Sequence, residues 1–171
     1  MPIPLDARHI ANQQGDFAPQ HQNNWMLEIA GLAGDAKDLI VLSLQSGALP
    51  NESSDEVEIA YGNEKRYAAG QTTYETIPLV IRDWVDREVR KAVQDWRGLV
   101  YDPETGLVGL PSEYKKTADL ILVASNNSVL RVCRLVGVWP QSVNGGTLDM
   151  TSSEQVLIEV NLRYDRAIWD L

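Results

Sequence analysis

Apolar and polar residues alternate most regularly near the C-terminus of the chain. Val156, Ile158, Val160, Leu162 and Tyr164 fall on one side of an extended segment, and charged or amide side chains fall on the other. A period of two residues is typical of a strand that buries one face and exposes the other. The pattern therefore predicts a half-buried β-strand over this stretch.

Two apolar runs lie upstream of this strand, at residues 117–124 and 129–139, and the turn sequence "SNNS" separates them. A short turn between two strand patterns favours an antiparallel hairpin. Near the other end of the chain, Trp25, Leu27 and Ile29 alternate with polar residues and predict another strand. Several strands joined by short turns favour an antiparallel sheet.

The region between these strands gives a mixed pattern. Residues 39–44, "LIVLSL", are largely apolar on both faces and predict a second, buried strand. Residues 45–56 are polar and rich in Ser, with Gly and Pro, and they predict a long loop. A loop of this length in a small domain usually has a function or is disordered.

Two further strands are predicted after this loop. The alternation in "VEIAY" directs Val57, Ile59 and Tyr61 inward, and residues 72–81, "TTYETIPLVI", form the next strand. Pro78 has no N–H to donate to a neighbouring strand, so it must lie at an edge or a bulge.

One helix is predicted, over about residues 84–97. Its apolar residues recur at helical spacing and form a single stripe, made of Val85, Val89, Ala92, Val93 and Trp96. Asp83 is a natural N-cap, Asp86 and Arg90 are spaced for an ion pair, and Gly98 suits the C-terminal end. The fold class is therefore mainly β, an antiparallel barrel or sandwich with one flanking α-helix. It forms a single domain over residues 25–171, after an N-terminal segment, 1–24, that is mobile until assembly orders it.

The charge argues against binding of nucleic acid as a primary role. The chain of 171 residues has a net charge of −9, and residues 1–60 carry nine acidic against two basic side chains. Proteins that bind duplex nucleic acid cluster Lys and Arg instead. The exception is "PSEYKK", where Lys115 and Lys116 follow Tyr114. This small basic and aromatic spot is either a solvated loop or a contact for another protein.

Little in the sequence indicates catalysis. His9 and His21 both lie in the N-terminal segment, so no histidine is near the strand-borne carboxylates, and no spacing of metal ligands is visible. Cys133 lies in the middle of an apolar run and is expected to be a buried, unreactive thiol. We therefore expect no enzyme activity, no cofactor and no metal. We also expect no membrane anchor, because no apolar run reaches the length of a membrane span.

Several features predict self-association. The predicted strands have few covering elements, and aromatic residues fall at predicted strand ends, at Tyr114, Trp139 and Trp169. Free strand edges invite pairing with another copy of the chain. A head-to-tail contact of this kind closes into rings or continues as a filament.

A set of motifs in consistent order resembles the tail tube protein of contractile-tailed bacteriophages. The most specific are "PSEYKKTADL", then "LVGVWPQSV", "LDM" and "VLIEVNLRYD"; "GDFAP", "ALP" and "AAG" add weaker support nearer the N-terminus. Together they cover most of residues 15–166. Residues 99–110 and 1–14 look individual to this chain.

The resemblance implies a role in a virion. In this family, six β-barrel-like protomers join their sheets into a ring with a β-lined lumen, and the rings stack into a tube inside a contractile sheath. The implied partners are further copies of the chain, the sheath protein, the baseplate and tail terminator proteins, and a tape measure protein in the lumen. DNA is bound only in transit. The implied location is the virion tail, with assembly in the host cytoplasm.

The resemblance also assigns residues to contacts. The inter-subunit candidates are Asp16, Phe17, Leu49, Pro50, Tyr114, Lys115, Lys116 and Trp139. The candidates for lining the lumen are Glu56, Glu58, Glu159, Asn161 and Arg163. A conduit should not retain its cargo, so a net acidic or neutral lumen is expected.

Other interpretations of the sequence remain open. The same fold could form the inner tube of a type VI secretion-like or bacteriocin particle. A monomeric β-sandwich that binds a small ligand, or a hydrolase, is less consistent with the motifs.

Overall fold

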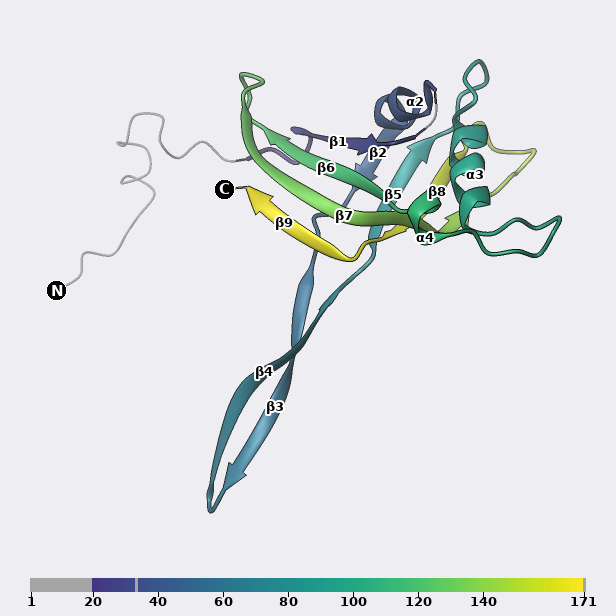
Figure 1. Cartoon of the computed structure of the whole chain (residues 1–171). Coiled ribbons are helices and arrows are strands. Elements are labelled where there is room, and N and C mark those ends of the chain that lie inside the picture. Colours follow the sequence, from purple (N-terminus) through teal and green to yellow (C-terminus); the bar gives the residue numbers. More distant parts are fainter. Residues whose placement is uncertain (1–19, 33, 171) are drawn as a thin grey trace.

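The computed structural model describes residues 20–32 and 34–170. Figure 1 shows a β-rich body from which a long two-stranded arm projects. The elements in chain order are β1 (Trp25–Ala30), α2 (Ala36–Ser43), β2 (Leu44–Gly47), β3 (Glu52–Tyr61), β4 (Glu64–Tyr74), β5 (Ile77–Arg82), α3 (Val89–Val100), α4 (Pro111–Tyr114), β6 (Lys116–Val123), β7 (Val129–Asn144), β8 (Leu157–Arg163) and β9 (Arg166–Asp170).

The body is one strongly curved antiparallel sheet. Its strand order is β1-β6-β7-β8-β5-β2, and β9 pairs with β7 beside this path. The long strand β7 joins the two halves, because its first part pairs with β6 and β9, and its last part, Trp139–Asn144, pairs with β8. Gly137, at the change of partner, has a positive φ of 73°.

The core lies on the concave side of this sheet and under the helices. Alternating residues of the strands face it, and α3 adds one apolar stripe made of Val89, Ala92, Val93, Trp96 and Val100. The predicted fold class, mainly antiparallel β with little helix, is confirmed. The predicted domain limits stay a prediction, and residues 1–19 of the N-terminal segment lie outside the described residues.

The strands with clear alternation are where the sequence places them. Leu27 and Ile29 of β1 are buried, and so are Ile158, Val160 and Leu162 of β8. β6 and β7 form the predicted hairpin. Tyr164, the last residue of the alternating run, is also buried although it lies just after β8. The sequence did not predict β9, whose short pattern follows directly.

The predicted strand over residues 39–44 is wrong, because most of this run belongs to helix α2. Ala36, Leu39, Ile40 and Ser43 turn toward the core at helical spacing, and Leu42 is 80% exposed. An apolar run of this length does not distinguish a buried strand from a helix. The helix begins three residues before this run, at Ala36, which belongs to the stripe that faces the core.

The predicted loop over residues 45–56 is also wrong. Its first part is β2 and its last part belongs to β3, so residues 48–51 alone lie outside the strands. β3 and β4 pair with each other and leave the body (Figure 1), and Val57, Ile59 and Tyr61 are exposed rather than inward. The run predicted as one strand over residues 72–81 is divided between β4 and β5. At Pro78 the pairing with β2 has already ended, which confirms its position at a local edge.

The helix exists but begins later than predicted. α3 starts at Val89, and Val85 is fully exposed in a turn that is closed by a bridge between Trp84 and Arg87. Asp83 is therefore not the N-cap, and the predicted Asp86–Arg90 ion pair is replaced by one between Asp83 and Arg90, at 2.7 Å. The helix also continues past Gly98 to Val100.

Candidate assembly surfaces

The arm, defined as β3 and β4 with their connecting turn, is the most exposed element of the molecule. Every residue of β3 is exposed, and both strands contact chiefly each other. Two hydroxyl pairs support the register near the base, Ser53 with Thr73 at 3.1 Å and Ser54 with Thr72 at 2.8 Å. Backbone pairing, these hydroxyl pairs and an ion pair between Lys65 and Glu58 at 2.9 Å therefore hold the 11-residue strand β4 to β3, away from the body.

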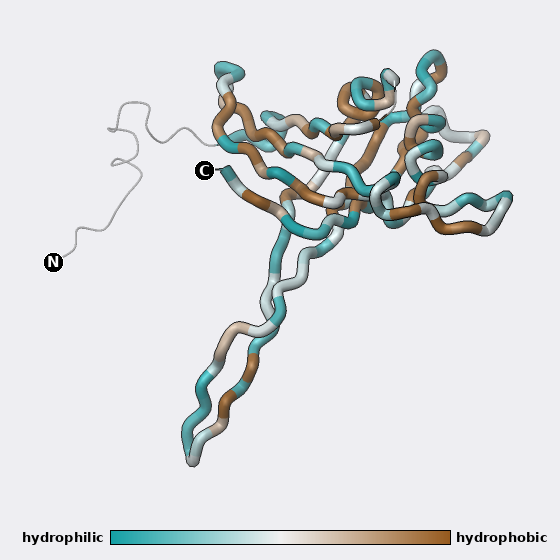
Figure 2. The backbone as a smooth tube through the Cα atoms, viewed as in Figure 1, coloured by the Kyte–Doolittle hydropathy of each residue, from teal (hydrophilic) through white to brown (hydrophobic). Residues whose placement is uncertain are grey.

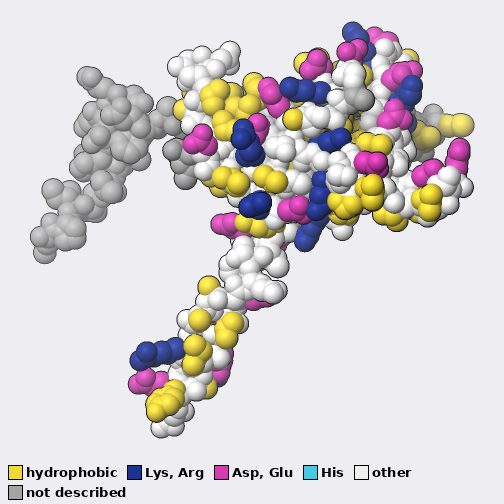
Figure 3. All heavy atoms as spheres, viewed as in Figure 1, with side chains coloured by type: hydrophobic (Ala, Val, Ile, Leu, Met, Phe, Trp, Pro, Cys, Tyr) yellow, Lys and Arg dark blue, Asp and Glu magenta, His cyan; other side chains and the backbone are white. Residues whose placement is uncertain are grey.

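The arm exposes apolar side chains to solvent. Val57, Ile59, Tyr61 and Tyr67 have exposed fractions between 50% and 89%. Hydrophobic and charged residues are interleaved along the arm (Figures 2 and 3). An isolated two-stranded hairpin is only marginally stable in water, which makes the arm a candidate for contact with another surface.

The sequence contains a signal for the arm in the turn between its two strands. Gly62 and Asn63 form a two-residue connection between β3 and β4, and Gly62 has a positive φ of 62°. A Gly-Asn pair between two alternating runs is typical of a tight hairpin. The lumen candidates Glu56 and Glu58 lie on this arm. Their placement in the lumen stays a prediction.

The basic spot of "PSEYKK" is part of an intrachain cluster, here called the clasp, that joins Tyr114 and Lys115 to Trp96, Trp139 and Asp165. The Lys115 ammonium lies 2.8 Å from both carboxylate oxygens of Asp165, which follows β8. The ring of Tyr114 packs edge-to-face on Trp139, with centroids 5.7 Å apart. Trp96 of α3 donates a hydrogen bond to the Tyr114 carbonyl at 3.0 Å. Three distant motifs therefore meet at this point.

Glycine residues complete the clasp. A Cβ on Gly137 would collide with the Asp165 carboxylate, and a Cβ on Gly31 would sit 3.3 Å from the side chain of Lys116. Tyr114, Lys115, Lys116 and Trp139 are each half-buried. Their contact with a second subunit stays a prediction, and the structure assigns Lys115 and the two aromatic rings partners within the chain.

The lumen candidates on β8 form a polar row that alternates with the buried residues of the strand and points away from the core. Asn161 donates to Ser142 at 2.9 Å, and Asn144 donates to Glu159 at 3.3 Å, both across the β7–β8 pair. Arg163 is opposite Trp139 in the same register. Besides Glu159 and Arg163, whose charges are opposite, the row and its β7 partners consist of amide and hydroxyl groups that are already hydrogen-bonded, which suits a surface that does not retain a passing polymer. Whether it lines a lumen stays a prediction.

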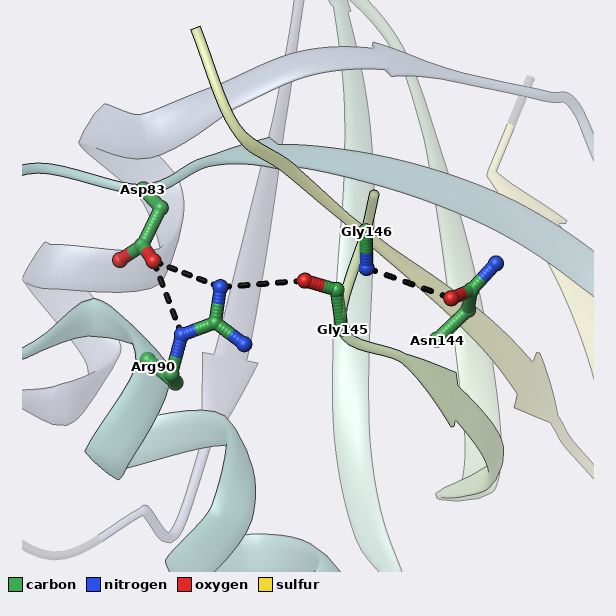
Figure 4. A network of polar contacts seen from close by, with 5 residues as sticks. All are labelled: Asp83, Arg90, Asn144, Gly145 and Gly146. Atoms are coloured by element: carbon green, nitrogen blue, oxygen red, sulfur yellow. Dashed lines mark hydrogen bonds and ion pairs between the residues drawn. The ribbon is translucent and has the colours of Figure 1, made fainter. Parts of the chain in front are cut away.

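A second polar network, which was not predicted, fixes α3 to the loop after β7 (Figure 4). Arg90 donates to Asp83 at 2.9 Å and to the Gly145 carbonyl at 3.1 Å, and Gly146 donates to the Asn144 side chain at 3.2 Å. Gly146 has a positive φ of 85°, and a Cβ there would collide with the Leu157 carbonyl. The helix and the strand-end loop are therefore held in one arrangement.

The remaining candidates lie elsewhere. Leu49 is 50% exposed and Pro50 is half-buried, and both lie between β2 and the arm. Asp16 and Phe17 are outside the described residues. Cys133 is buried as predicted, and its burial raises the pKa of the thiol to about 11. Among residues 20–32 and 34–170, His, Cys, Asp and Glu form no group that could hold a metal ion. None of the described helices is long and apolar enough to span a membrane.

The fold is that of the tube proteins of contractile injection systems. A chain of the sheath-tube complex of the extracellular contractile injection system PVC, in its extended state, superimposes with a TM-score of 0.69, covering 98% of this chain and 99% of that chain at 18% identity. A chain of the anti-feeding prophage cap, which terminates the tube of the anti-feeding prophage, gives a TM-score of 0.71 at 17% identity, covering 94% of this chain and 96% of that chain.

In sequence, the chain is similar to the tail tube protein gp19 of Enterobacteria phage T4. The two are 25% identical over 158 residues, which are 91% of this chain and 93% of that protein. No protein-family model matches the chain. The resemblance to contractile-tail tube proteins, noted on the motifs, is therefore confirmed.

Proposed function

We propose that this chain is the structural subunit of the inner tube of a contractile phage tail and that it has no catalytic role. The observation that carries the proposal is the arm, a pair of strands that exposes Val57, Ile59, Tyr61 and Tyr67 and needs a covering partner. Similarity to a phage tail tube protein over nine-tenths of the chain supports the same role. In the proposed tube, the covering partner is a copy in the next ring.

The finer features of the proposal extend the family resemblance. Six copies form a ring, the polar row of β8 faces the lumen, and DNA passes through it without specific binding. The sheath protein surrounds the tube, baseplate and terminator proteins meet its ends, and a tape measure protein occupies the lumen before ejection. Assembly takes place in the host cytoplasm, and the finished tube is part of the virion tail.

Electron microscopy of the concentrated protein tests this proposal. Rings, or tubes of stacked rings, are expected in negative stain, with baseplate components added as a nucleus where the subunit alone stays monomeric. A chain that stays monomeric at high concentration with such a nucleus would contradict the tube role.

The inner tube of a related injection particle is the second candidate, because chains of two such particles share the fold over nine-tenths or more of this chain. Gold-labelled antibody against the chain, applied to particles from the source lysate, separates the two. Label on tails attached to DNA-filled heads supports the phage tail. Label confined to headless particles supports the second candidate.

A further inference from the structure

The two terminal strands of the main sheet, β1 and β2, leave a hollow between them. They are not neighbours in the strand order of the described sheet, and they meet through one aromatic ring, because a Cβ on Gly47 of β2 would lie 2.9 Å from the ring of Trp25. A cavity of about 740 Å³ lies beside this ring. Its apolar lining includes Trp25, Met26, Leu44, Leu49, Leu120 and Leu122.

The lining of this hollow is uncharged. None of the described residues that line it is Asp, Glu, Lys or Arg, although 23% of the whole chain is charged. Two of its apolar side chains, Met26 and Leu49, have exposed fractions of 40% and 50%. A charged group inside the hollow would be left without a partner, which is costly. The hollow therefore suits an uncharged, apolar occupant.

The chain enters the described structure at the rim of the hollow, where residues 20–23 form part of the wall. The Gln20 side chain donates hydrogen bonds to the Val123 carbonyl at 3.1 Å and to the Asn24 carbonyl at 3.2 Å. The Val123 amide donates in turn to the Asn24 carbonyl at 3.1 Å. Gln20 is therefore tied to the ends of β1 and β6, and the residues that precede it start from a fixed point beside the hollow.

One large apolar side chain precedes this fixed point by three residues. Residues 16–19 are "DFAP", and Phe17 is the single phenylalanine of the chain. An extended residue spans at most about 3.6 Å, so Phe17 is tethered within about 11 Å of Gln20. A phenylalanine ring buries about 150–250 Å² when it is enclosed, and its two neighbours, Ala18 and Pro19, are uncharged.

We propose that the ring of Phe17 fills the hollow of its own chain and covers the gap between β1 and β2. A short tether gives a segment an effective concentration of about millimolar, whereas a segment of another copy must approach against the repulsion between two chains of charge −9. The family resemblance alone would place Phe17 at a contact between subunits. The inference concerns the single subunit and does not depend on the proposed tube function.

Other exposed segments are poorer occupants of the hollow. The arm follows Leu49, but its strands lead away from the body (Figure 1), and its apolar Ile59 is directly opposite Arg66. The hairpin that follows α3 carries Asp102 and Glu104. Both segments would bring charges to an uncharged lining, and neither is tethered at the rim as residues 16–19 are.

A disulfide within the chain tests the contact on the dilute, unassembled subunit. The Phe17→Cys, Leu49→Cys variant places one thiol on residue 17 and one in the lining of the hollow. Mild oxidation is expected to give a cross-linked monomer on a non-reducing gel, and mass spectrometry after alkylation should find both engineered thiols blocked. Buried Cys133 should not contribute. In the control variant Phe17→Cys, Leu107→Cys, the second thiol is at a 69% exposed position after α3, and both thiols should stay free.

The other outcomes of this experiment would overturn the inference. Covalent oligomers in place of the cross-linked monomer would show that residue 17 of another copy occupies the hollow. Free thiols at both positions, or equal cross-linking in the control, would show that residue 17 does not select the hollow.

Thermal unfolding gives a second measurement that needs no cysteine. Phe17→Ala should lower the melting temperature of the unassembled subunit by several degrees, because it would empty the hollow, and Phe17→Leu should restore most of the loss. Ile10→Ala, farther along the same segment, is the control and should change little. An unchanged melting temperature for Phe17→Ala would overturn the inference and leave the tube function intact. Failure of the unmodified chain to form rings or tubes would instead overturn the proposed function and leave this contact standing.

Discussion

Gly137 shows how single residues determine the shape of the clasp. It takes a positive φ where β7 changes partners, and it lies against the Asp165 carboxylate that Lys115 binds. The "GVW" and "EYKK" motifs of the sequence therefore meet in space for a structural reason. The sequence predicted that these residues matter and assigned them to a contact between subunits. It could not predict that they pair within the chain, because pairing across 50 residues depends on the tertiary fold.

Replacement of Gly137 by alanine should be strongly destabilising. Alanine would have to adopt the left-handed φ of this position, and its Cβ would displace the Asp165 carboxylate. Strain of this kind costs about 1–3 kcal/mol. Urea unfolding of Gly137→Ala measures the change in the free energy of unfolding. Gly98→Ala is the matched control, because that glycine lies in α3 with open space around it. The control should be neutral or more stable, by up to about 1 kcal/mol.

Two buried acids predict a loss of stability at high pH. Desolvation raises the pKa of the Cys133 thiol to about 11 and that of the Tyr164 phenol to about 12. The folded state therefore holds these protons more tightly than the unfolded state. The resulting stabilisation is complete below about pH 9 and is lost as the pH rises through 11 to 12. The melting temperature should fall as the pH is raised from 8 to 12, and that of the Tyr164→Phe variant should fall less steeply above pH 10. Parallel curves for the two proteins would show that Tyr164 does not contribute.

At the scale of elements, the periodicity of apolar residues predicted the strands and the helix that bury one face against the core. It failed for elements whose apolar residues do not all face the core. β1, β6, β7, β8 and α3 bury one clear face, and the sequence placed them all. α2 was missed because the exposed Leu42 makes the run apolar on both faces, as in a buried strand, and the arm was missed because its apolar residues do not face any core. The arm is also the main candidate for a contact surface. Alternation indicates that a strand has an apolar face but not what covers it.

Trp96 is expected to be the main anchor of α3. Its side chain is 3% exposed, and its indole N–H donates to the Tyr114 carbonyl. Removing a buried aromatic ring costs about 3–5 kcal/mol, so Trp96→Ala should unfold at a much lower temperature or fail to fold. Gln94→Ala, on the exposed side of the helix, is the control and should change little. An unchanged melting temperature for Trp96→Ala would show that this stripe is not essential to the core.

Deletion of the arm should separate folding from assembly. The Glu75 amide donates to the Asn51 carbonyl at 3.1 Å and Glu52 pairs with Tyr74, so the two ends of the arm are adjacent. A short Gly-Asn turn can therefore replace residues 53–73 and leave Tyr74 packed against Tyr164. The shortened chain should keep its β circular dichroism spectrum and its melting temperature, because the arm contacts chiefly itself. It should form no stacked tubes in the electron microscope. Normal tubes from the shortened chain would show that the arm is dispensable for stacking.

At the scale of the whole molecule, charge opposes assembly and apolar contact must overcome it. Six copies with a net charge of −9 would bring −54 into one ring. The described ion pairs, such as Lys115 with Asp165 and Arg134 with Asp119, lie within the chain and do not offset this repulsion between copies. In the proposed tube, the exposed apolar residues of the arm would supply the opposing attraction.

Assembly should therefore become more favourable as salt is added. Screening shortens the range of repulsion to about 10 Å at 0.1 M and about 3 Å at 1 M, whereas burial of apolar surface does not depend on screening. Sedimentation of tubes at a series of sodium chloride concentrations measures the subunit concentration that remains soluble, and this concentration should fall as salt rises.

The Lys115→Glu, Lys116→Glu variant tests the alternative that these two lysines contact a neighbouring copy. If these lysines bind acids of a neighbouring copy, salt should dissolve the unmodified tubes and the variant should not assemble at all. If Lys115 acts only in the clasp, the variant should lose thermal stability while any folded protein keeps the same direction of salt dependence.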